Sequence, residues 1–230
     1  MFTRTLATFA TFASIASLLM GCAVPRPMAF GNDTDVIGDR NKALFLLTAT
    51  LKNSYRTSYQ PILLRVHIER KEVKDSNNRL VFLVDDKAIL KTDTPEGNSY
   101  LLRMELENGD YVIRGLSGYS AKFPFTGLFF APLHTETKSN GAGIFYLGHI
   151  AATVRERKEN EFKAGPSTPL IDQAVTGFSG GTFDIEITDR LEEDEPVFKS
   201  TFAALRSRNI QKAILPRFDR VKAQQWWEAN

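Results

Sequence analysis

The stretch YLLRMELENGDYVIRGL, residues 100–116, carries the clearest structural pattern of this 230-residue chain. Apolar side chains occupy alternate positions in its first half: Tyr100, Leu102, Met104 and Leu106. The opposite face carries charged residues: Arg103, Glu105 and Glu107. This alternation predicts a strand with one buried face. Asn108-Gly109 fits a two-residue hairpin turn in which both residues have a positive φ, and Tyr111 and Ile113 resume the alternation. The stretch therefore predicts a β-hairpin of two paired, neighbouring strands.

Further runs of branched and aromatic residues, separated by turn residues, predict more strands. They cover residues 43–51, 61–69, 79–86, 125–133, 143–156 and 181–189. About eight short strands with no helical stretch between them are typical of an antiparallel β-sandwich. NGDYVIRGL (108–116) and GIFYLGHI (143–150) also resemble strands of transthyretin-like and carboxypeptidase-regulatory-like modules and of several uncharacterised bacterial lipoproteins. This resemblance implies an immunoglobulin- or transthyretin-like sandwich and does not point to a site.

The N-terminus carries a targeting signal. Residues 6–20 form an apolar run without a charge, after a short basic start. The run is shorter than the about 20 residues of a membrane-spanning helix, so it is typical of a secretory signal peptide. It ends in a motif that resembles the lipobox of bacterial lipoproteins: Leu19-Met20-Gly21-Cys22. The resemblance implies cleavage before Cys22, diacylglycerol on its thiol and acylation of the new amine, and Ala23 implies sorting to the outer membrane. The alternatives are an uncleaved membrane anchor and a cysteine that is only a small apolar residue.

The composition divides the chain into four predicted parts. They are a signal peptide at 1–21, a lipidated tether at 22–40, a β-sandwich domain at 41–191 and a helical C-terminal segment at 192–230. In the last part we expect Asp194 to cap a helix over residues 194–208, with Pro196 in its first turn. A second helix is predicted over residues 209–230, interrupted at Pro216.

The charge balance limits the classes of partner. A net charge of +2 and a hydrophobic fraction of 43% are ordinary for a globular protein and do not favour nucleic acid. The expected partners are the membrane, through the N-terminal lipid, and an envelope protein or a cell-wall component. Trp226 and Trp227 are the candidate contact residues. A helix from Arg217 would turn one stripe inward: Phe218, Val221 and Gln225. Trp226 would then lie at the edge and Trp227 on the opposite side. The alternative, which the preference of large aromatics for cores favours, is that both indoles cap the sandwich.

One sequence motif suggests catalysis. GFSGG, residues 177–181, matches the Gly-x-Ser-x-Gly pattern of a serine nucleophile. The residue order of trypsin-like proteases could be filled by His67, Asp85 or Asp86, and Ser179. Against this, Phe178 stands where the protease family has Asp. No His follows Ser179, as an α/β-hydrolase triad requires, and the predicted element after it is a strand.

The sequence predicts no metal site and no cofactor. The histidines His67, His134 and His149 stand apart, without the spacing of zinc ligands. The acidic run at 192–195 lacks the alternating ligands and central Gly of a calcium loop. We therefore expect an outer-membrane lipoprotein whose sandwich faces the periplasm as a non-catalytic binding or envelope-assembly module. A periplasmic serine hydrolase that uses Ser179 is the alternative.

Overall fold

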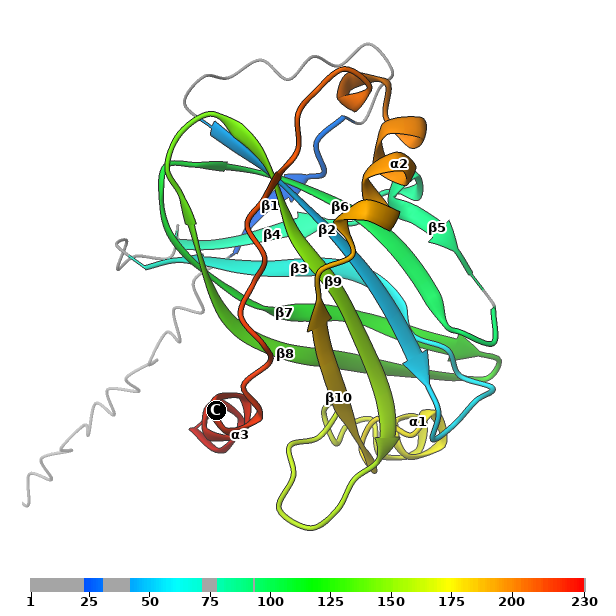
Figure 1. The fold of residues 1–230 in the computed structure, drawn as a ribbon. Helices are drawn as coiled ribbons and strands as arrows, with labels where there is room; N and C mark the ends of the chain where they lie inside the picture. Colours follow the sequence, from blue (N-terminus) through cyan, green and yellow to red (C-terminus); the bar gives the residue numbers. More distant parts are fainter. Residues whose placement is uncertain (1–22, 31–41, 72–77, 93, 230) are drawn as a thin grey trace, which may run out of the picture.

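The chain folds into two β-sheets that share one core, with three short helices around them (Figure 1). This computed structural model describes residues 23–30, 42–71, 78–92 and 94–229. The first sheet has the strand order β1-β4-β3-β7-β8, and the second has the order β10-β9-β2-β6-β5 with β11 beside β9. The prediction of a mainly β chain is confirmed.

The strands are β1 Val24–Pro27, β2 Lys42–Asn53, β3 Ile62–Arg70, β4 Arg79–Leu83, β5 Ile89–Lys91, β6 Asn98–Glu107, β7 Gly109–Lys122, β8 Phe125–Ser139, β9 Gly143–Glu156, β10 Gly181–Thr188 and β11 Gln211–Lys212. The α-helices are α1 Leu170–Thr176, α2 Leu191–Thr201 and α3 Arg220–Ala229, and the 3₁₀-helices are η2 Asp86–Ala88 and η3 Ala203–Leu205.

Both sheets are mixed, so the prediction of a purely antiparallel sandwich is wrong. β2 pairs in parallel with β9 along most of its length, and β1 pairs in parallel with β4. Residues 43–49 of β2 are buried without interruption. A strand buried on both faces reads as a continuous apolar run, which is the usual signature of a parallel-paired central strand. The run at 43–51 therefore carried a signal for parallel pairing.

The predicted hairpin at residues 100–116 is also wrong, although both of its strands exist. β6 lies in the second sheet, where it pairs with β2 and β5, while β7 lies in the first sheet between β3 and β8. Gly109 has a φ of 150°, but Asn108 does not have a positive φ. The chain thus crosses from one sheet to the other at this point. Leu106 and Tyr111 still point into the same core, because alternation reports the buried face of a strand and not its neighbour.

The C-terminal segment differs from its prediction in both helices. α2 begins at Leu191, so Asp194 lies inside the helix, where it is buried, and Pro196 lies in the helix interior. The second predicted helix is extended in its first half. β11 pairs with β9, and the amides of Ala213 and Leu215 donate to carbonyl groups of β9. Only α3 is helical, and α1 was not predicted.

Part of the predicted tether belongs to the folded domain. Residues 24–27 form β1 at the edge of the first sheet, and Met28 is buried in the main core. The amide of Ala29 donates to the carbonyl group of Arg103 on β6. Within the described residues, the first strand of the domain therefore begins at Val24, inside the predicted tether.

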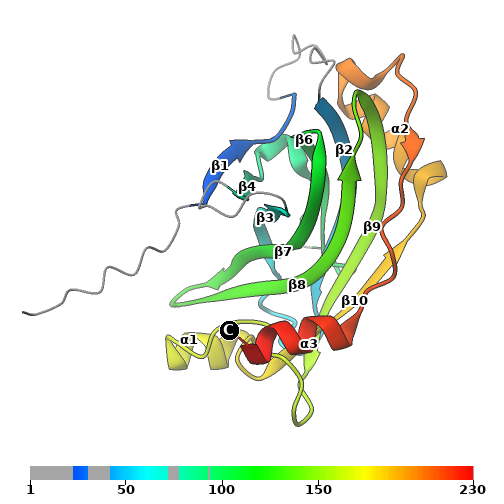
Figure 2. The same cartoon turned by 90° about the vertical axis from the view of Figure 1, so that its left-hand side faces the viewer.

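A second, smaller core holds α2 and η3 on the outer face of the second sheet. Leu44 and Leu46 of β2 pack there against Phe198 and Phe202. Arg103, which the alternation placed outward, is completely buried beneath this cover. Its guanidinium lies over the ring of Phe202 at 4.2 Å, and its Nη2 donates to Asp85 at 2.5 Å. Figure 2 shows α2 along the second sheet, while α1 and α3 lie at the lower end of the molecule.

Candidate functional site

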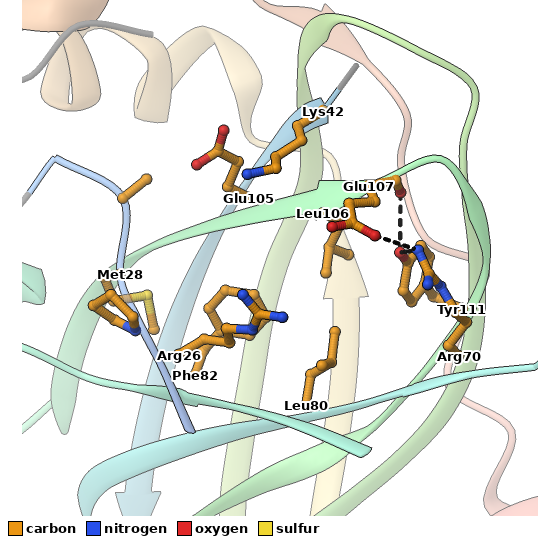
Figure 3. Close-up of a pocket in the computed structure, with 12 residues that line it drawn as sticks. Arg26, Met28, Lys42, Arg70, Leu80, Phe82, Glu105, Leu106, Glu107 and Tyr111 are labelled. Carbon is orange, nitrogen blue, oxygen red and sulfur yellow. Dashed lines mark hydrogen bonds and ion pairs between the residues drawn. The ribbon is translucent and has the colours of Figure 1, made fainter. Parts of the chain in front are cut away.

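A cavity of about 350 Å³ opens between the two sheets (Figure 3). Residues 26–29, together with β4, form one wall, and the end of β6 forms the opposite wall. The sides of the cavity are closed by the start of β2, the end of β3 and the start of β7. The cavity exists because β6 and β7 belong to different sheets, which leaves the end of the sandwich open near residue 108.

The floor of this cavity is apolar. Leu80 and Phe82 occupy the inward positions of β4, and Met28 and Leu106 face them from the other sides. Phe82, Met28 and Leu106 belong to the main core and are almost completely buried. A pocket of this size with an apolar floor suits a small apolar group, since ligand pockets usually begin near 300 Å³.

One side of the rim is a fixed polar group. Nη2 of Arg70 donates to Oε2 of Glu107 at 2.9 Å and to the hydroxyl of Tyr111 at 3.1 Å. That hydroxyl in turn donates to the backbone carbonyl of Glu107 at 3.0 Å. Burial raises the pKa of Tyr111, so its phenol stays protonated at neutral pH. These contacts hold Arg70 in one position at the mouth.

The other side of the rim presents Arg26. β1 pairs Arg26 with Phe82, and directly paired residues share a face, so the guanidinium extends over the apolar floor. Its charge is near enough to lower the pKa of Tyr111, against the larger effect of burial. Among the described residues, no carboxylate forms an ion pair with Arg26, whereas Arg70 is paired with Glu107. Lys42 and Glu105 extend toward each other at the upper rim in Figure 3.

This cavity combines charged walls with an apolar floor. Its cations are Arg26, Lys42 and Arg70, and its carboxylates are Glu105 and Glu107. The walls thus carry a surplus of one positive charge above an apolar floor. The lining offers neither a histidine nor a paired nucleophile and base.

A buried polar cluster lies on the outer face of the second sheet. Oγ1 of Thr48 donates to Oδ2 of Asp194 at 2.5 Å, and the hydroxyl of Tyr146 donates to the same oxygen. Nδ1 of His149 lies 2.9 Å from Oγ1 of Thr48. Because the hydrogen of Thr48 is used on Asp194, the ring of His149 must donate from Nδ1. Burial, helped by Arg190, lowers the pKa of His149 to about 4, so the ring is neutral.

The cluster fastens α2 to the second sheet. Its residues come from β2, β9 and α2. Thr48, His149 and Asp194 also line a cavity of about 420 Å³. In a Ser-His-Asp triad the carboxylate orients the imidazole, whereas here Asp194 accepts hydrogen bonds from Thr48 and Tyr146 instead. Burial also raises the pKa of Tyr146, and the hydrogen bond to Asp194 adds to this effect. We interpret the cluster as a structural clamp.

The proposed serine triad is not assembled. Ser179 lies in the turn after α1, its amide donates to the carbonyl of Gln173, and β10 follows it. Nε2 of His67 lies 2.6 Å from Oγ of Ser117, and Asp85 is paired with Arg103. Asp86 begins η2. His67 and Asp85 therefore have partners outside the proposed triad, and Ser179 lies in a separate turn.

Both tryptophans lie against the domain itself. The ring of Trp226 stacks on His134 at 4.6 Å and on Phe130 at 5.4 Å, both from β8. Trp227 packs against the main core, while Val221 is 67% exposed. The predicted inward stripe is therefore wrong for Val221 and Gln225, because α3 begins at Arg220 and turns Ala223 inward. Trp227 does not protrude as predicted.

His134 is the most unusual of the three histidines. It has a φ of 47° and is buried between Arg114 and Trp226, and its Nε2 has no hydrogen-bond partner. Burial, followed by the charge of Arg114, lowers the pKa of His134 to about 4. In the described part of the chain, no group of three or more His, Cys, Asp or Glu side chains could hold a metal ion.

The predicted lipid attachment residue, Cys22, lies outside the described residues. Within the described ranges, no helix is long and apolar enough to span a bilayer. No family model, no curated protein and no solved structure matches this chain.

Proposed function

We propose that the chain is a lipoprotein of the outer membrane, anchored through Cys22, whose β-rich domain is a non-catalytic binding module on the periplasmic face. The lipobox-like motif after the apolar run supports the anchor. The position of β1 is compatible with this anchor, because Val24 lies two residues after Cys22 and the proposed cleavage would leave the strand intact. Replacement of Cys22 by Ser should release the chain from membranes into the soluble fraction.

We also propose a transthyretin-like type for the sandwich. Two facing sheets with a common core and the crossing between β6 and β7 support this type, since Greek-key sandwiches place consecutive strands in different sheets. The parallel pairing of β2 with β9 and of β1 with β4 is a departure from it.

The cavity between the sheets is the proposed binding site, and its ligand is a small anionic amphiphile. The position of Arg26 carries this proposal: its guanidinium lies over an apolar floor, and no carboxylate among the described residues forms an ion pair with it. An acyl or aromatic group would contact Phe82 and Leu106. A carboxylate or phosphate would lie between Arg26 and the fixed Arg70, where charge-assisted hydrogen bonds are strongest.

Calorimetry with octanoate tests this site on a Cys22→Ala chain made without its signal peptide. Octanoate should bind and octyltrimethylammonium, with the same chain length and the opposite charge, should not. Arg26→Gln should weaken octanoate binding about tenfold, because a hydrogen bond to a charged group contributes about 1.5 kcal/mol or more.

Arg65→Gln is the matched control. Arg65 is also exposed and also lies in the first sheet, but it is paired with Leu83 on the opposite face. Equal weakening by both variants, or equal binding of the two ligands, would contradict the proposed site.

A further inference from the structure

We infer that the outer face of the first sheet lies against the bilayer, and that the β7–β8 turn and α1 form a second membrane contact at the other end of this sheet from the lipid. This inference rests on the proposed anchor at Cys22. We call the exposed apolar residues of this surface the docking face: Leu83, Phe123, Leu128, Leu170 and Ile171.

The chain enters the domain on this side. Ala23 lines a cavity of about 340 Å³ together with His67, Val81, Phe130 and Trp226. His67 and Val81 are directly paired across β3 and β4, and both point away from the main core. With β1 starting at Val24, only Ala23 separates Cys22 from a hydrogen-bonded strand. A lipid on Cys22 would therefore hold this face close to the membrane surface.

The exposed apolar side chains gather on the same side. Phe123, in the turn between β7 and β8, is 99% exposed, and Leu128 continues the outer face along β8. Leu170 and Ile171 of α1 are 72% and 68% exposed. Asp172 accepts a hydrogen bond from the amide of Thr126, so α1 lies directly beside the start of β8.

The three segments share one side of the molecule. In Figure 2 the start of β1, the β7–β8 turn and α1 all lie at the left-hand margin, while α2 and β10 lie to the right. One flat surface can therefore touch the entry of the chain and both apolar segments. A single exposed apolar side chain needs no explanation, but several on one side mark an interaction surface.

The charges around the docking face fit an anionic bilayer. Arg65, Arg79 and Lys122 are exposed on the first sheet. Glu69 is held in an ion pair with Arg114 at 2.5 Å, and Asp172 accepts a hydrogen bond from the amide of Thr126. Asp86 is an exposed carboxylate near Leu83. Anionic phospholipids attract basic side chains near the membrane surface. Basic residues beside an exposed aromatic are typical of a surface that enters the headgroup region.

A fluorescent probe at position 123 tests the contact. The lipid-modified full-length protein with Phe123→Cys is placed in phosphatidylethanolamine–phosphatidylglycerol vesicles and labelled with an environment-sensitive dye. Because the thiol of Cys22 carries lipid, the new thiol is the one that reacts. We expect a blue-shifted emission and quenching by nitroxide lipids several-fold stronger than at the control position.

Ile89→Cys is the control. Ile89 is 42% exposed on β5, at the edge of the second sheet. Equal quenching at positions 89 and 123 would overturn the orientation. A blue shift at position 123 that depends on protein concentration and needs no vesicles would show that a second copy covers the face, and would overturn it too.

Mass spectrometry of the same sample shows whether Cys22 carries lipid, and so distinguishes failure of the docking face from failure of the anchor. A lipidated Cys22 with a water-exposed probe at position 123 would overturn the docking face and leave the anchor intact. A Cys22 without lipid would overturn the anchor and, with it, the orientation that starts from Ala23.

Discussion

The domain should lose stability as the pH falls from about 7.5 to about 5, because its buried histidines stay neutral in the folded state. Burial lowers the pKa of His134 and of His149 to about 4, and also lowers that of His67. In the unfolded chain each pKa is about 6.5. A group with a lowered folded pKa contributes stability above its unfolded pKa. That contribution is lost as the pH falls toward the folded pKa, because only the unfolded chain takes up the proton.

The size of the loss follows from the two pKa values. At about pH 5, a histidine that titrates near 4 when folded and near 6.5 when unfolded destabilises the fold by at most about 2 kcal/mol. His149 lines a cavity beside Arg190, and water there reduces the effect. We therefore expect about 1 to 2 kcal/mol for each of His134 and His149. Most carboxylates remain ionised above about pH 5 and contribute little in this range.

Urea denaturation of the wild type and of His149→Asn at both pH values measures this loss. The amide nitrogen of Asn takes the place of Nδ1 and can still donate to Thr48. The variant should keep the pH dependence that His134 causes and lose about 1 to 2 kcal/mol of the difference between the two pH values. Equal pH dependence in both proteins would refute the argument that His149 is a neutral buried donor.

Three further predictions concern packing and chemistry. Trp226→Ala should destabilise the domain by about 1 to 3 kcal/mol, because a half-buried aromatic loses its stacking partners, whereas Val221→Ala should stay within about 0.5 kcal/mol in the same urea titration. Gly118→Ala should prevent stable folding, since its Cβ would clash with the carbonyl oxygen of Ile62, and a soluble variant with an unchanged melting temperature would contradict this packing. A fluorophosphonate probe should not label the wild type more than Ser179→Ala; labelling that depends on Ser179 would restore the hydrolase alternative.

The sequence predicted which faces of the strands are buried, but not which strands are neighbours. Leu102 and Ile113 point into the core as their alternation indicates. Their strands were predicted to pair, yet they face each other from different sheets. An Asn-Gly pair permits a tight turn without requiring one. The strand that β6 pairs with is decided instead by its antiparallel register with β2, which extends over ten residue pairs.

Tertiary contacts also overrode local signals near the C-terminus. Residues 209–219 have helix-forming composition, but amides such as that of Ala213 donate to carbonyls of β9 instead. Arg103 shows the same effect, because its outward position on β6 is buried in the folded chain, where Phe202 lies over its guanidinium. No local pattern contains this information.

The candidate sites could not be predicted either, because their residues come together only in the folded chain. The cavity takes Arg26, Arg70 and Phe82 from three strands that meet only in the folded sheet. The clamp joins Thr48 to Asp194 across 146 positions of the sequence. Single charged or hydroxyl residues in strands are common, so neither set stands out before the topology is known.

Mass spectrometry of the mature N-terminus, on protein extracted from bacterial membranes, tests the lipid anchor. The first residue should be Cys22, with a mass increase that equals diacylglycerol on the thiol and one acyl chain on the amine. An unmodified Cys22, or a first residue anywhere else in the chain, would contradict it.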